Sequence, residues 1–397
     1  MIFYKRFNLT HFVENLSKSM DLILSGEPSK HSLRVAFTAV LISYKLNLTK
    51  GQRINLYLAS LLHDIGAVEK ETKLLFEYEQ RDCKDLQRHA VVGYELLKNI
   101  PLFENIADII RDHHNPESNN LLSRIIYLSD EVDIILRNNK IFDPEVLEGK
   151  IYLNYKSKPI FKDILDAFLS ILRNDAFLMM IYNIDEIKKY LRANVEVRSV
   201  SVTHNLFNNI AKSIAESFID KKSRFTLTHS SDVAYTAFKI AKEIGLSDMD
   251  CQTVKTASFL HDIGKLFVPV NILEYPGKLE SEDWFKMKSH VYYTYSFLNQ
   301  MNLDENIIHI ASSHHEYLDG SGYPFGLDKT SLSTGAQILT VADIYSALRR
   351  KRPYRNKAFN HTEASEVLLN LANCGKINKE LVNAVKYIDI FDTQNTF

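Results

Sequence analysis

One ordered set of histidine and aspartate residues occurs twice in this chain of 397 residues, and this repeat constrains the fold more than any other feature. The interval from the first histidine to a His-Asp doublet is 32 residues in both copies, and the interval from a lone histidine to a His-His doublet is 24 in both. The first copy consists of His31, His63, Asp64, His89, His113, His114 and Asp130, and the second of His229, His261, Asp262, His290, His314, His315 and Asp343. A repeat this long indicates duplicated domains, because the units of a solenoid are roughly 20 to 50 residues long.

The two copies differ in their last interval. It is 16 residues from His114 to Asp130 but 28 residues from His315 to Asp343. The twelve additional residues include the segment 316–324, which reads EYLDGSGYP. The sequence therefore predicts an extra loop in the second copy, beside its His-His doublet.

The fold predicted from the hydrophobic pattern is all-α. Apolar residues recur at helical spacing in 35–44, 54–62 and 122–135 of the first half, and in 233–244 and 334–348 of the second. Glycine and proline gather in 268–277 and 320–326, which we expect to be ordered loops beside ligand positions. We predict two tandem helical domains, 1–199 and 200–397, since the length also suits two or three domains.

Composition limits where the protein acts and what it binds. The net charge of −1 gives no overall attraction to nucleic acid or to anionic membranes, so any phosphate recognition must be local. The three cysteines lack paired spacing, which excludes a thiolate zinc site and suits a reducing compartment. We found no signal-peptide pattern at the first residues and no apolar run near the roughly 18 residues of a membrane span, so the expected location is cytoplasmic.

The repeated residues are the ligand types of a metal centre without sulfur. Neutral imidazole with carboxylate suits first-row ions such as iron, manganese or zinc, of which we favour iron or manganese. Five histidines and two aspartates per copy are too many for one tetrahedral ion and suit two divalent ions that share a bridging carboxylate. Adjacent residues on a helix diverge by about 100°, so each doublet can approach such a pair of ions from two directions.

The second half carries further residues in a characteristic order. They are His261-Asp262-Ile263-Gly264-Lys265, Pro269 with Ile272-Leu273, Pro276-Gly277, His314-His315-Glu316, Asp319-Gly320, Gly322-Tyr323-Pro324, Ala342-Asp343 and Arg352-Pro353-Tyr354-Arg355. This series resembles the HD-GYP phosphodiesterases, a branch of the HD superfamily, over most of 200–397. The resemblance implies an all-α fold with two or sometimes three metals, and hydrolysis of cyclic dinucleotides such as cyclic di-GMP. Some members, including tandem-domain ones, prefer 3′,3′-cyclic GMP-AMP.

The resemblance also assigns the ligands of the second copy. They are His229, His261, Asp262, His290, His314, His315 and Asp343, with Asp262 as the bridge between ions. Family members with three metals place a glutamate nine residues before the first histidine, where this chain has Asp220, so two ions are expected. Ser346 departs from the family, which commonly has aspartate at that position.

Catalytic and substrate-binding roles are expected around the same site. Lys265 follows Asp262 by three residues, about one helical turn, so its ammonium is predicted to reach a phosphate oxygen and to act in catalysis with Asp262. Arg352 and Arg355 are predicted phosphate or guanine contacts, because a guanidinium binds such groups with two hydrogen bonds. The predicted wall for the nucleotide consists of Asp319, Gly320, Gly322, Tyr323 and Pro324.

The first copy keeps all seven ligand types but lacks the substrate residues. Ala67 stands in place of Lys265, Asn115-Pro116 stands in place of Glu316-Tyr317, and the Gly-Tyr-Pro loop is missing. This half resembles a plain HD domain. Three interpretations remain open, namely a second hydrolase for small nucleotides, a metal-bound regulatory or dimerising module, and a structural relic. We favour the module.

The leading functional hypothesis is a metal-dependent phosphodiesterase that opens a cyclic dinucleotide to a linear product. The alternatives are a non-catalytic nucleotide receptor, an HD-type nucleotide phosphohydrolase and an HD-type di-iron oxygenase, of which the last is disfavoured by Lys265 and the loop. The expected partner is the cyclic dinucleotide, without a nucleic-acid duplex or a membrane, and a homodimer is left open.

Overall fold

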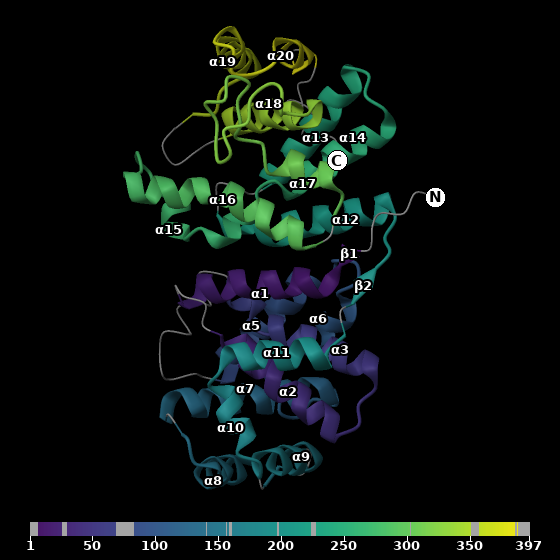
Figure 1. Cartoon of the computed structure of the whole chain (residues 1–397), viewed down its shortest axis with the longest axis vertical. Helices are drawn as coiled ribbons and strands as arrows, with labels where there is room; N and C mark the ends of the chain where they lie inside the picture. Colours follow the sequence, from purple (N-terminus) through teal and green to yellow (C-terminus); the bar gives the residue numbers. More distant parts are fainter. Residues whose placement is uncertain are drawn as a thin grey trace. The chain divides into compact units, whose positions relative to one another are not determined.

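The computed structural model describes residues 7–25, 30–68, 83–139, 141–155, 157–158, 161–196, 198–223, 228–301, 303–350, 357–385 and 387. The chain separates into two compact units, one of Leu9–Ser199 and one of Val200–Phe397 with the residues up to Asn8. Helices make up nearly all of both units (Figure 1). The strands found in the described ranges are the two-residue β1 (Phe7–Asn8) and β2 (Ser199–Val200), which pair with each other.

The N-terminal unit, drawn from purple to teal in Figure 1, is built from short and medium helices. They are α1 (Leu9–Ser25), α2 (His31–Lys45), α3 (Lys50–Leu62), the 3-10 turn η1 (Ile65–Val68), α5 (Cys83–Leu97), α6 (Glu104–Arg111), α7 (Leu121–Asn139), α8 (Pro144–Tyr155), α9 (Lys162–Leu172), α10 (Ala176–Ile181) and α11 (Ile184–Asn194). The helices α2, α3, α5, α6 and α7 carry or adjoin the first set of ligands.

The C-terminal unit repeats this order from α13 onward. Its elements are α12 (His204–Ile214), the π turn η3 (Ala215–Ile219), η4 (Asp220–Lys222), α13 (His229–Glu243), α14 (Asp248–Leu260), the 3-10 turn η5 (Ile263–Phe267), α15 (Val270–Leu273), α16 (Ser281–Gln300), α17 (Glu305–Ala311), α18 (Thr334–Leu348), α19 (His361–Asn373) and α20 (Lys379–Val385). The series α13, α14, η5, α16, α17 and α18 corresponds to α2, α3, η1, α5, α6 and α7.

Matching start signals place the His-Asp doublet at the end of a helix in both units. A hydroxyl side chain caps the N-terminus of each helix, Thr49 accepting from the amide of Gln52 in α3 and Ser247 from that of Asp250 in α14. In both helices the histidine of the doublet is the C-cap residue, directly after the last helical residue, and the chain continues as a 3-10 turn. The doublet therefore stands where the chain leaves the helix and its two side chains can diverge.

A glycine in each 3-10 turn fixes how closely that turn packs on the helix carrying the lone histidine. A Cβ atom on Gly66 would lie 2.0 Å from the carbonyl oxygen of His89, and one on Gly264 would lie 1.9 Å from that of His290. No residue with a side chain fits at these distances. The close approach brings each doublet beside the lone histidine of its copy.

Both units have an apolar core that surrounds the ligand-bearing helices. Val35 and Leu58 in the first unit, and Val233 and Leu260 in the second, are fully buried. Burial of such side chains stabilises each by roughly 1.5 to 3 kcal/mol relative to exposure. Among the described helices, none combines the length and the apolar composition that a membrane span requires.

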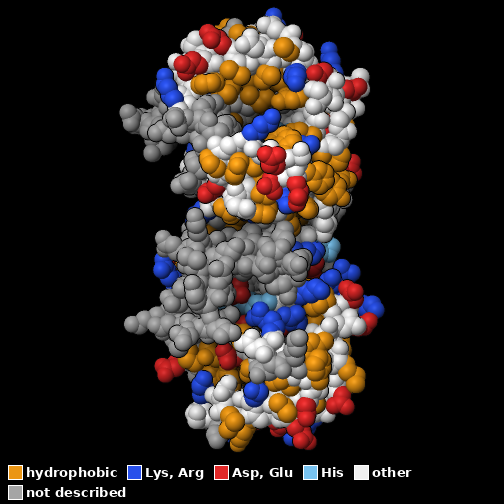
Figure 2. Space-filling view, turned by 90° about the vertical axis from the view of Figure 1, so that its left-hand side faces the viewer, with side chains coloured by type: hydrophobic (Ala, Val, Ile, Leu, Met, Phe, Trp, Pro, Cys, Tyr) orange, Lys and Arg blue, Asp and Glu red, His pale blue; other side chains and the backbone are white. Residues whose placement is uncertain are grey.

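Figure 2 shows how the charges of the described residues are distributed on one face of the molecule. Where side chains are coloured, acidic and basic ones are interspersed with hydrophobic ones. This distribution agrees with the net charge of −1, so recognition of an anion depends on local side chains.

Candidate metal centres

The structure brings the predicted ligands of each copy together from five places in the fold. The first histidine opens α2 or α13, the doublet ends α3 or α14, the lone histidine lies in α5 or α16, the His-His doublet follows α6 or α17, and the last aspartate lies in α7 or α18. The groups whose ligand atoms lie within 4.8 Å of one another are Asp64, His89, His113 and His114; His31, His63 and Asp64; His290, His314 and His315; His229, His261 and Asp343; and His261, Asp262 and His314.

Asp262 lies at the centre of the second cluster and presents its two oxygens to different histidines. Its Oδ2 atom is 3.3 Å from Nε2 of His261 and 3.8 Å from Nε2 of His229. Its Oδ1 atom is 3.5 Å from Nε2 of His290 and 3.7 Å from Nε2 of His314. This is the arrangement that a carboxylate needs to bridge two cations.

Asp64 has the same place in the first cluster. Its Oδ2 atom lies 3.5 Å from Nε2 of His31 and 3.4 Å from Nε2 of His63, and its Oδ1 atom lies 3.3 Å from Nε2 of His89. The last aspartate also matches, because Asp130 Oδ1 is 3.2 Å from His31 Nε2. The corresponding Asp343–His229 distance is 3.1 Å.

The histidine tautomers leave nitrogen lone pairs pointed at each other. Nδ1 of His290 donates to the carbonyl of Met287 at 2.6 Å, and Nδ1 of His314 donates to that of Ala311 at 2.8 Å. A carbonyl can only accept, so Nε2 of each neutral ring is unprotonated. Burial lowers the pKa of His290 to about 3 and that of His314 well below the usual value, so both rings are neutral near pH 7.

The two bare Nε2 atoms of His290 and His314 are only 3.3 Å apart. They share no proton, so their lone pairs repel unless a cation lies between or beside them. The carboxylates complete such a site: burial alone would raise the pKa of Asp262, but the charges of His261 and Lys265 outweigh it and hold the pKa well below its usual range. The residues therefore fit divalent cations by geometry, tautomer and charge.

Lys265 is the main charged difference between the two clusters. Its Nζ lies 2.5 Å from Oδ2 of Asp262, and its side chain is 15% exposed, so the ammonium lies at the edge of the cluster. The corresponding residue of the first unit, Ala67, is fully buried and has no charge. Among the described residues, only the second copy has a lysine in contact with its central carboxylate.

The loop of the second copy is held against the cluster by its own backbone. The buried carboxylate of Glu316 accepts from the amides of Phe325 at 2.7 Å and Leu327 at 3.0 Å. The amide of Tyr323 donates to the carbonyl of His315 at 3.1 Å, and the rings of these two residues lie 4.9 Å apart. Tyr323 therefore covers one of the candidate ligands.

Other predicted loop residues shape the turn itself. Oδ1 of Asp319 accepts from the amide and the hydroxyl of Ser321, at 3.0 and 2.6 Å. Gly320 has a φ of +74°, which favours glycine, and a Cβ atom on Gly322 would lie 2.4 Å from Cα of Glu316. These contacts make Asp319 and the two glycines part of the loop's framework. Arg352 and Arg355, predicted to bind phosphate or guanine, lie outside the described residues.

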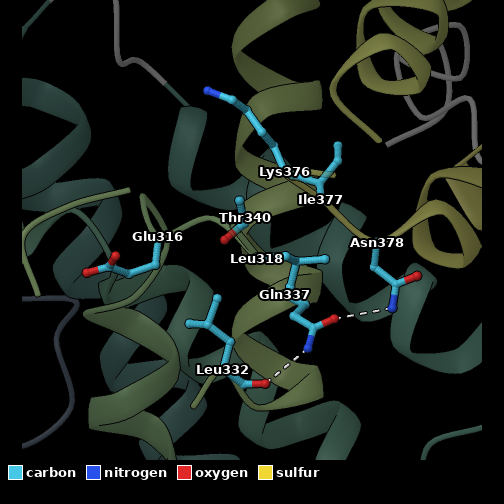
Figure 3. Close-up of a pocket in the computed structure, with 8 residues that line it drawn as sticks. All are labelled: Glu316, Leu318, Leu332, Gln337, Thr340, Lys376, Ile377 and Asn378. Carbon is cyan, nitrogen blue, oxygen red and sulfur yellow. Dashed lines mark hydrogen bonds between the residues drawn. The ribbon is translucent and has the colours of Figure 1, made fainter. Parts of the chain in front are cut away.

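A small hollow lies behind this loop (Figure 3). It is lined by Glu316, Leu318, Leu332, Gln337, Thr340, Lys376, Ile377 and Asn378. The amide group of Gln337 donates to the carbonyl of Leu332 at 3.0 Å and accepts from Asn378 at 3.2 Å. None of the candidate ligands lines the hollow, so we regard it as part of the support of the loop.

Two residues near the loop were not singled out from the sequence. Trp284, which is 44% exposed, lies in α16 with its ring 6.0 Å from that of Tyr323. Nζ of Lys288 lies 5.9 Å from the centres of both rings. The signal was present, because Trp284 and Lys288 are four residues apart on the helix that also carries His290, but it becomes visible only when the loop is placed beside α16.

Comparison with known proteins identifies the class that this fold defines. Family models of the HD domain match the chain twice, over 29–135 and over 206–381. The chain is therefore a tandem HD-domain protein.

Its relatives include the 3′3′-cGAMP-specific phosphodiesterases 1 and 3 of Vibrio cholerae. The first is 27% identical over 89% of this chain and 86% of its own length, and the second is 26% identical over 88% of each. A cyclic di-GMP phosphodiesterase of Thermotoga maritima is 37% identical over 33% of this chain and 36% of its own length. These named homologues are cyclic dinucleotide phosphodiesterases.

A solved structure shows the same fold. The crystal structure of the cyclic GMP-AMP phosphodiesterase V-cGAP3 of V. cholerae matches with a TM-score of 0.61 and 22% identity, covering 96% of this chain and 98% of that one. The matches confirm the predicted all-α fold of two tandem HD domains and the resemblance to HD-GYP proteins.

Proposed function

We propose that this protein is a metal-dependent phosphodiesterase that opens a cyclic dinucleotide at its second HD domain, 200–397. The observation that carries the proposal is the geometry of Asp262, whose two oxygens face separate pairs of histidines while Lys265 contacts the same carboxylate. A site of this kind suits two divalent ions, with iron or manganese favoured. We also propose a cytoplasmic location, because the spacing of the three cysteines suits a reducing compartment.

The side chains of the second copy divide the work of phosphodiester cleavage. Two divalent cations bound there would supply activation of water and stabilisation of charge at phosphorus. Lys265 offsets the negative charge that grows on the phosphoryl oxygens, and Asp262 keeps that ammonium in place. Water adds to phosphorus as the bond to the 3′-oxygen breaks, and the leaving oxygen takes a proton, which yields a linear dinucleotide.

The aromatic residues next to the loop suit a nucleobase. Trp284 and Tyr323 offer ring faces for stacking, and Lys288 adds a cation near both of them. Stacking of a base on an aromatic side chain contributes about 1 to 3 kcal/mol and tolerates any base. This part of the site therefore supports a nucleotide substrate without choosing its base.

We favour 3′,3′-cyclic GMP-AMP over cyclic di-GMP as the better substrate. The relatives named for cyclic GMP-AMP align with nearly nine tenths of this chain in two cases. Three relatives named for cyclic di-GMP align with only 31–35% of this chain. The tandem arrangement is therefore shared with the first group.

The first HD domain, 1–199, is proposed as a metal-holding module without hydrolytic activity. It has the ligands but neither the lysine nor the loop. Binding needs only the histidines and aspartates, whereas cleavage also needs charge neutralisation and a wall for the substrate.

The test is product analysis with the full chain loaded with Mn²⁺ or Fe²⁺. Each cyclic dinucleotide is incubated with protein of measured metal content, and the products are separated by chromatography. We expect linear dinucleotides, with cyclic GMP-AMP consumed faster, and no product from Asp262→Asn, which keeps the side-chain volume but removes the bridging charge. Failure of the metal-loaded protein to cleave either nucleotide, or near wild-type cleavage by Asp262→Asn, would overturn the proposal.

A further inference from the structure

The first histidine ligand of the N-terminal copy has a carboxylate behind it. Nδ1 of His31 donates to Oδ2 of Asp133 at 2.6 Å, while Nε2 of the same ring points into the cluster. Asp133 is buried in α7, three residues after the last ligand of this copy. Arg34 of α2 and Arg137 of α7 both contact it, with Arg137 Nε at 2.9 Å from Oδ2. The carboxylate is therefore held in place by two guanidinium groups.

The C-terminal copy has exchanged these charges. Ser346 stands in α18 where α7 has Asp133, three residues after the last ligand. The arginine seven residues after that ligand is kept as Arg350, but its acidic partner now comes from the facing helix α13. Asp232 accepts from Nε of Arg350 at 2.7 Å and stands where α2 has Arg34.

Both copies thus keep an arginine–aspartate pair between the first and last ligand helices, with its polarity reversed. Arg34 of α2 pairs with Asp133 of α7, whereas Asp232 of α13 pairs with Arg350 after α18. The reversal preserves the link between the helices. In the first copy the acidic residue lies on α7 and contacts Nδ1 of His31. In the second copy it lies on α13 and contacts Arg350 instead.

We propose that Asp133 is a positioning residue that makes the N-terminal copy the tighter metal site of the two. Its carboxylate orients His31 and makes the ring a more basic ligand. Ser346 at the same place makes the C-terminal copy the more exchangeable site. The proposal rests on the proposed metal centres but not on phosphodiesterase activity.

The size of the expected difference follows from how ligands are supported. A histidine whose second nitrogen donates to a carboxylate is a stronger ligand than one that donates to a neutral group, and loss of such a partner typically lowers metal affinity about 10- to 100-fold. The matching histidines His63 and His261 each donate from Nδ1 to a backbone carbonyl, so these ligands are supported alike in the two copies. The difference that carries the proposal is therefore the carboxylate of Asp133 on His31, at a position where the second copy has Ser346.

The experiment measures metal retention by each copy within the full chain. His261→Ala with Asp262→Ala leaves only the first site, and His63→Ala with Asp64→Ala leaves only the second. Both proteins are loaded with Mn²⁺, dialysed against graded EDTA and analysed for manganese by atomic absorption. We expect the first site to keep its metal at an EDTA concentration at least about tenfold higher than the second.

Asp133→Asn in the protein with only the first site should lower retention by at least about tenfold, because it keeps the shape and removes the charge. Arg137→Ala is the matched control, since it removes a contact to Asp133 but leaves the carboxylate on His31; retention should change little. Equal or stronger retention by the second site, or an effect of Asp133→Asn no larger than that of Arg137→Ala, would contradict the proposal. If circular dichroism shows that Asp133→Asn is unfolded, the test is Ser346→Asp in the protein with only the second site. This change should raise metal retention by that site, and unchanged retention would contradict the proposal.

None of these readings requires a nucleotide. If the metal-loaded protein does not hydrolyse the nucleotide but the first site retains metal more strongly, the proposed function is contradicted and this inference stands. If the protein hydrolyses the nucleotide but the first site does not retain metal more strongly, this inference is contradicted and the proposed function stands.

Discussion

At the scale of single residues, Lys265 and Ala67 form the sharpest chemical contrast between two otherwise matched clusters. Both follow the His-Asp doublet by the same interval, yet one places an ammonium 2.5 Å from the central carboxylate and the other places a methyl group in the core. The metal ligands are the same in kind on both sides. The lysine is therefore the natural residue to test for a role in the chemical step.

Lys265→Ala should slow hydrolysis and leave the metals bound. Removal of one donor that stabilises transition-state charge typically costs about 10² to 10³ in rate. The measurement is the single-turnover rate together with metal content, and Lys278→Ala, an exposed lysine of the same unit, is the control. Unchanged turnover with normal metal content would show that Lys265 takes no part in the chemical step.

The buried histidines predict how stability of the metal-free protein depends on pH. Burial lowers the pKa of His290 to about 3 and that of His315 to about 4, whereas an unfolded histidine titrates near 6.5. Below about pH 6.5 the unfolded chain binds protons that the folded chain does not, so this stability is fully present above that pH and is lost as pH falls towards 4. The slope reaches about 1.4 kcal/mol per pH unit for each histidine.

We therefore expect the thermal midpoint of the metal-free protein to fall between pH 6.5 and 4.5, and to fall less steeply in His315→Gln. Thermal scans in a chelating buffer measure both. Parallel curves for the two proteins would show that His315 does not contribute in this way.

At the scale of elements, Glu316 fixes the path of the extra loop, because its buried carboxylate accepts from two backbone amides of that loop. Glu316→Gln replaces one acceptor oxygen by an NH₂ group, which then faces a backbone N–H of Phe325 or Leu327. A buried donor left without an acceptor costs about 1 to 3 kcal/mol. We expect the loop to loosen, the KM for the cyclic dinucleotide to rise and metal content to stay normal.

Steady-state kinetics with metal analysis measures this effect, and the exposed Glu117→Gln serves as the control. An unaltered KM in Glu316→Gln would mean that the loop does not help to bind substrate.

Much of each element could be predicted, because the repeat and the helical periodicity are both local in sequence. Spacing alone grouped His229 with Asp343 and placed the extra loop after His315. The contact from His31 to Asp133 could not be predicted in this way, because it depends on the rotation of α7 against α2. The same holds for Trp284 and Lys288. Their contact with Tyr323 depends on how the extra loop packs against α16, which the sequence does not show.

At the scale of the whole molecule, we expect the duplication to separate metal binding from hydrolysis. The double change His63→Ala and Asp64→Ala should lower metal stoichiometry or the thermal midpoint but leave hydrolysis largely intact. The same change at His261 and Asp262 should abolish hydrolysis. Metal analysis, thermal scans, size-exclusion chromatography and the rate are all needed, since lost ligands can also affect packing or assembly.

A first-copy variant that is folded and correctly assembled but inactive would contradict this division. In that case the two sites act together, and the assignment of one catalytic domain is wrong.

The position of Trp284 gives the protein an intrinsic optical reporter. It is the only tryptophan of the chain, and it lies beside Tyr323 and Lys288 at the edge of the second cluster. A base that stacks on the indole should quench its fluorescence, so titration with a non-hydrolysable cyclic dinucleotide analogue should change the emission, whereas Trp284→Phe should give no such signal. Because the N-terminal unit contains no tryptophan, every photon emitted by indole in the full chain reports on the C-terminal domain, and occupancy of that domain can be followed without labelling, cleavage or removal of its twin.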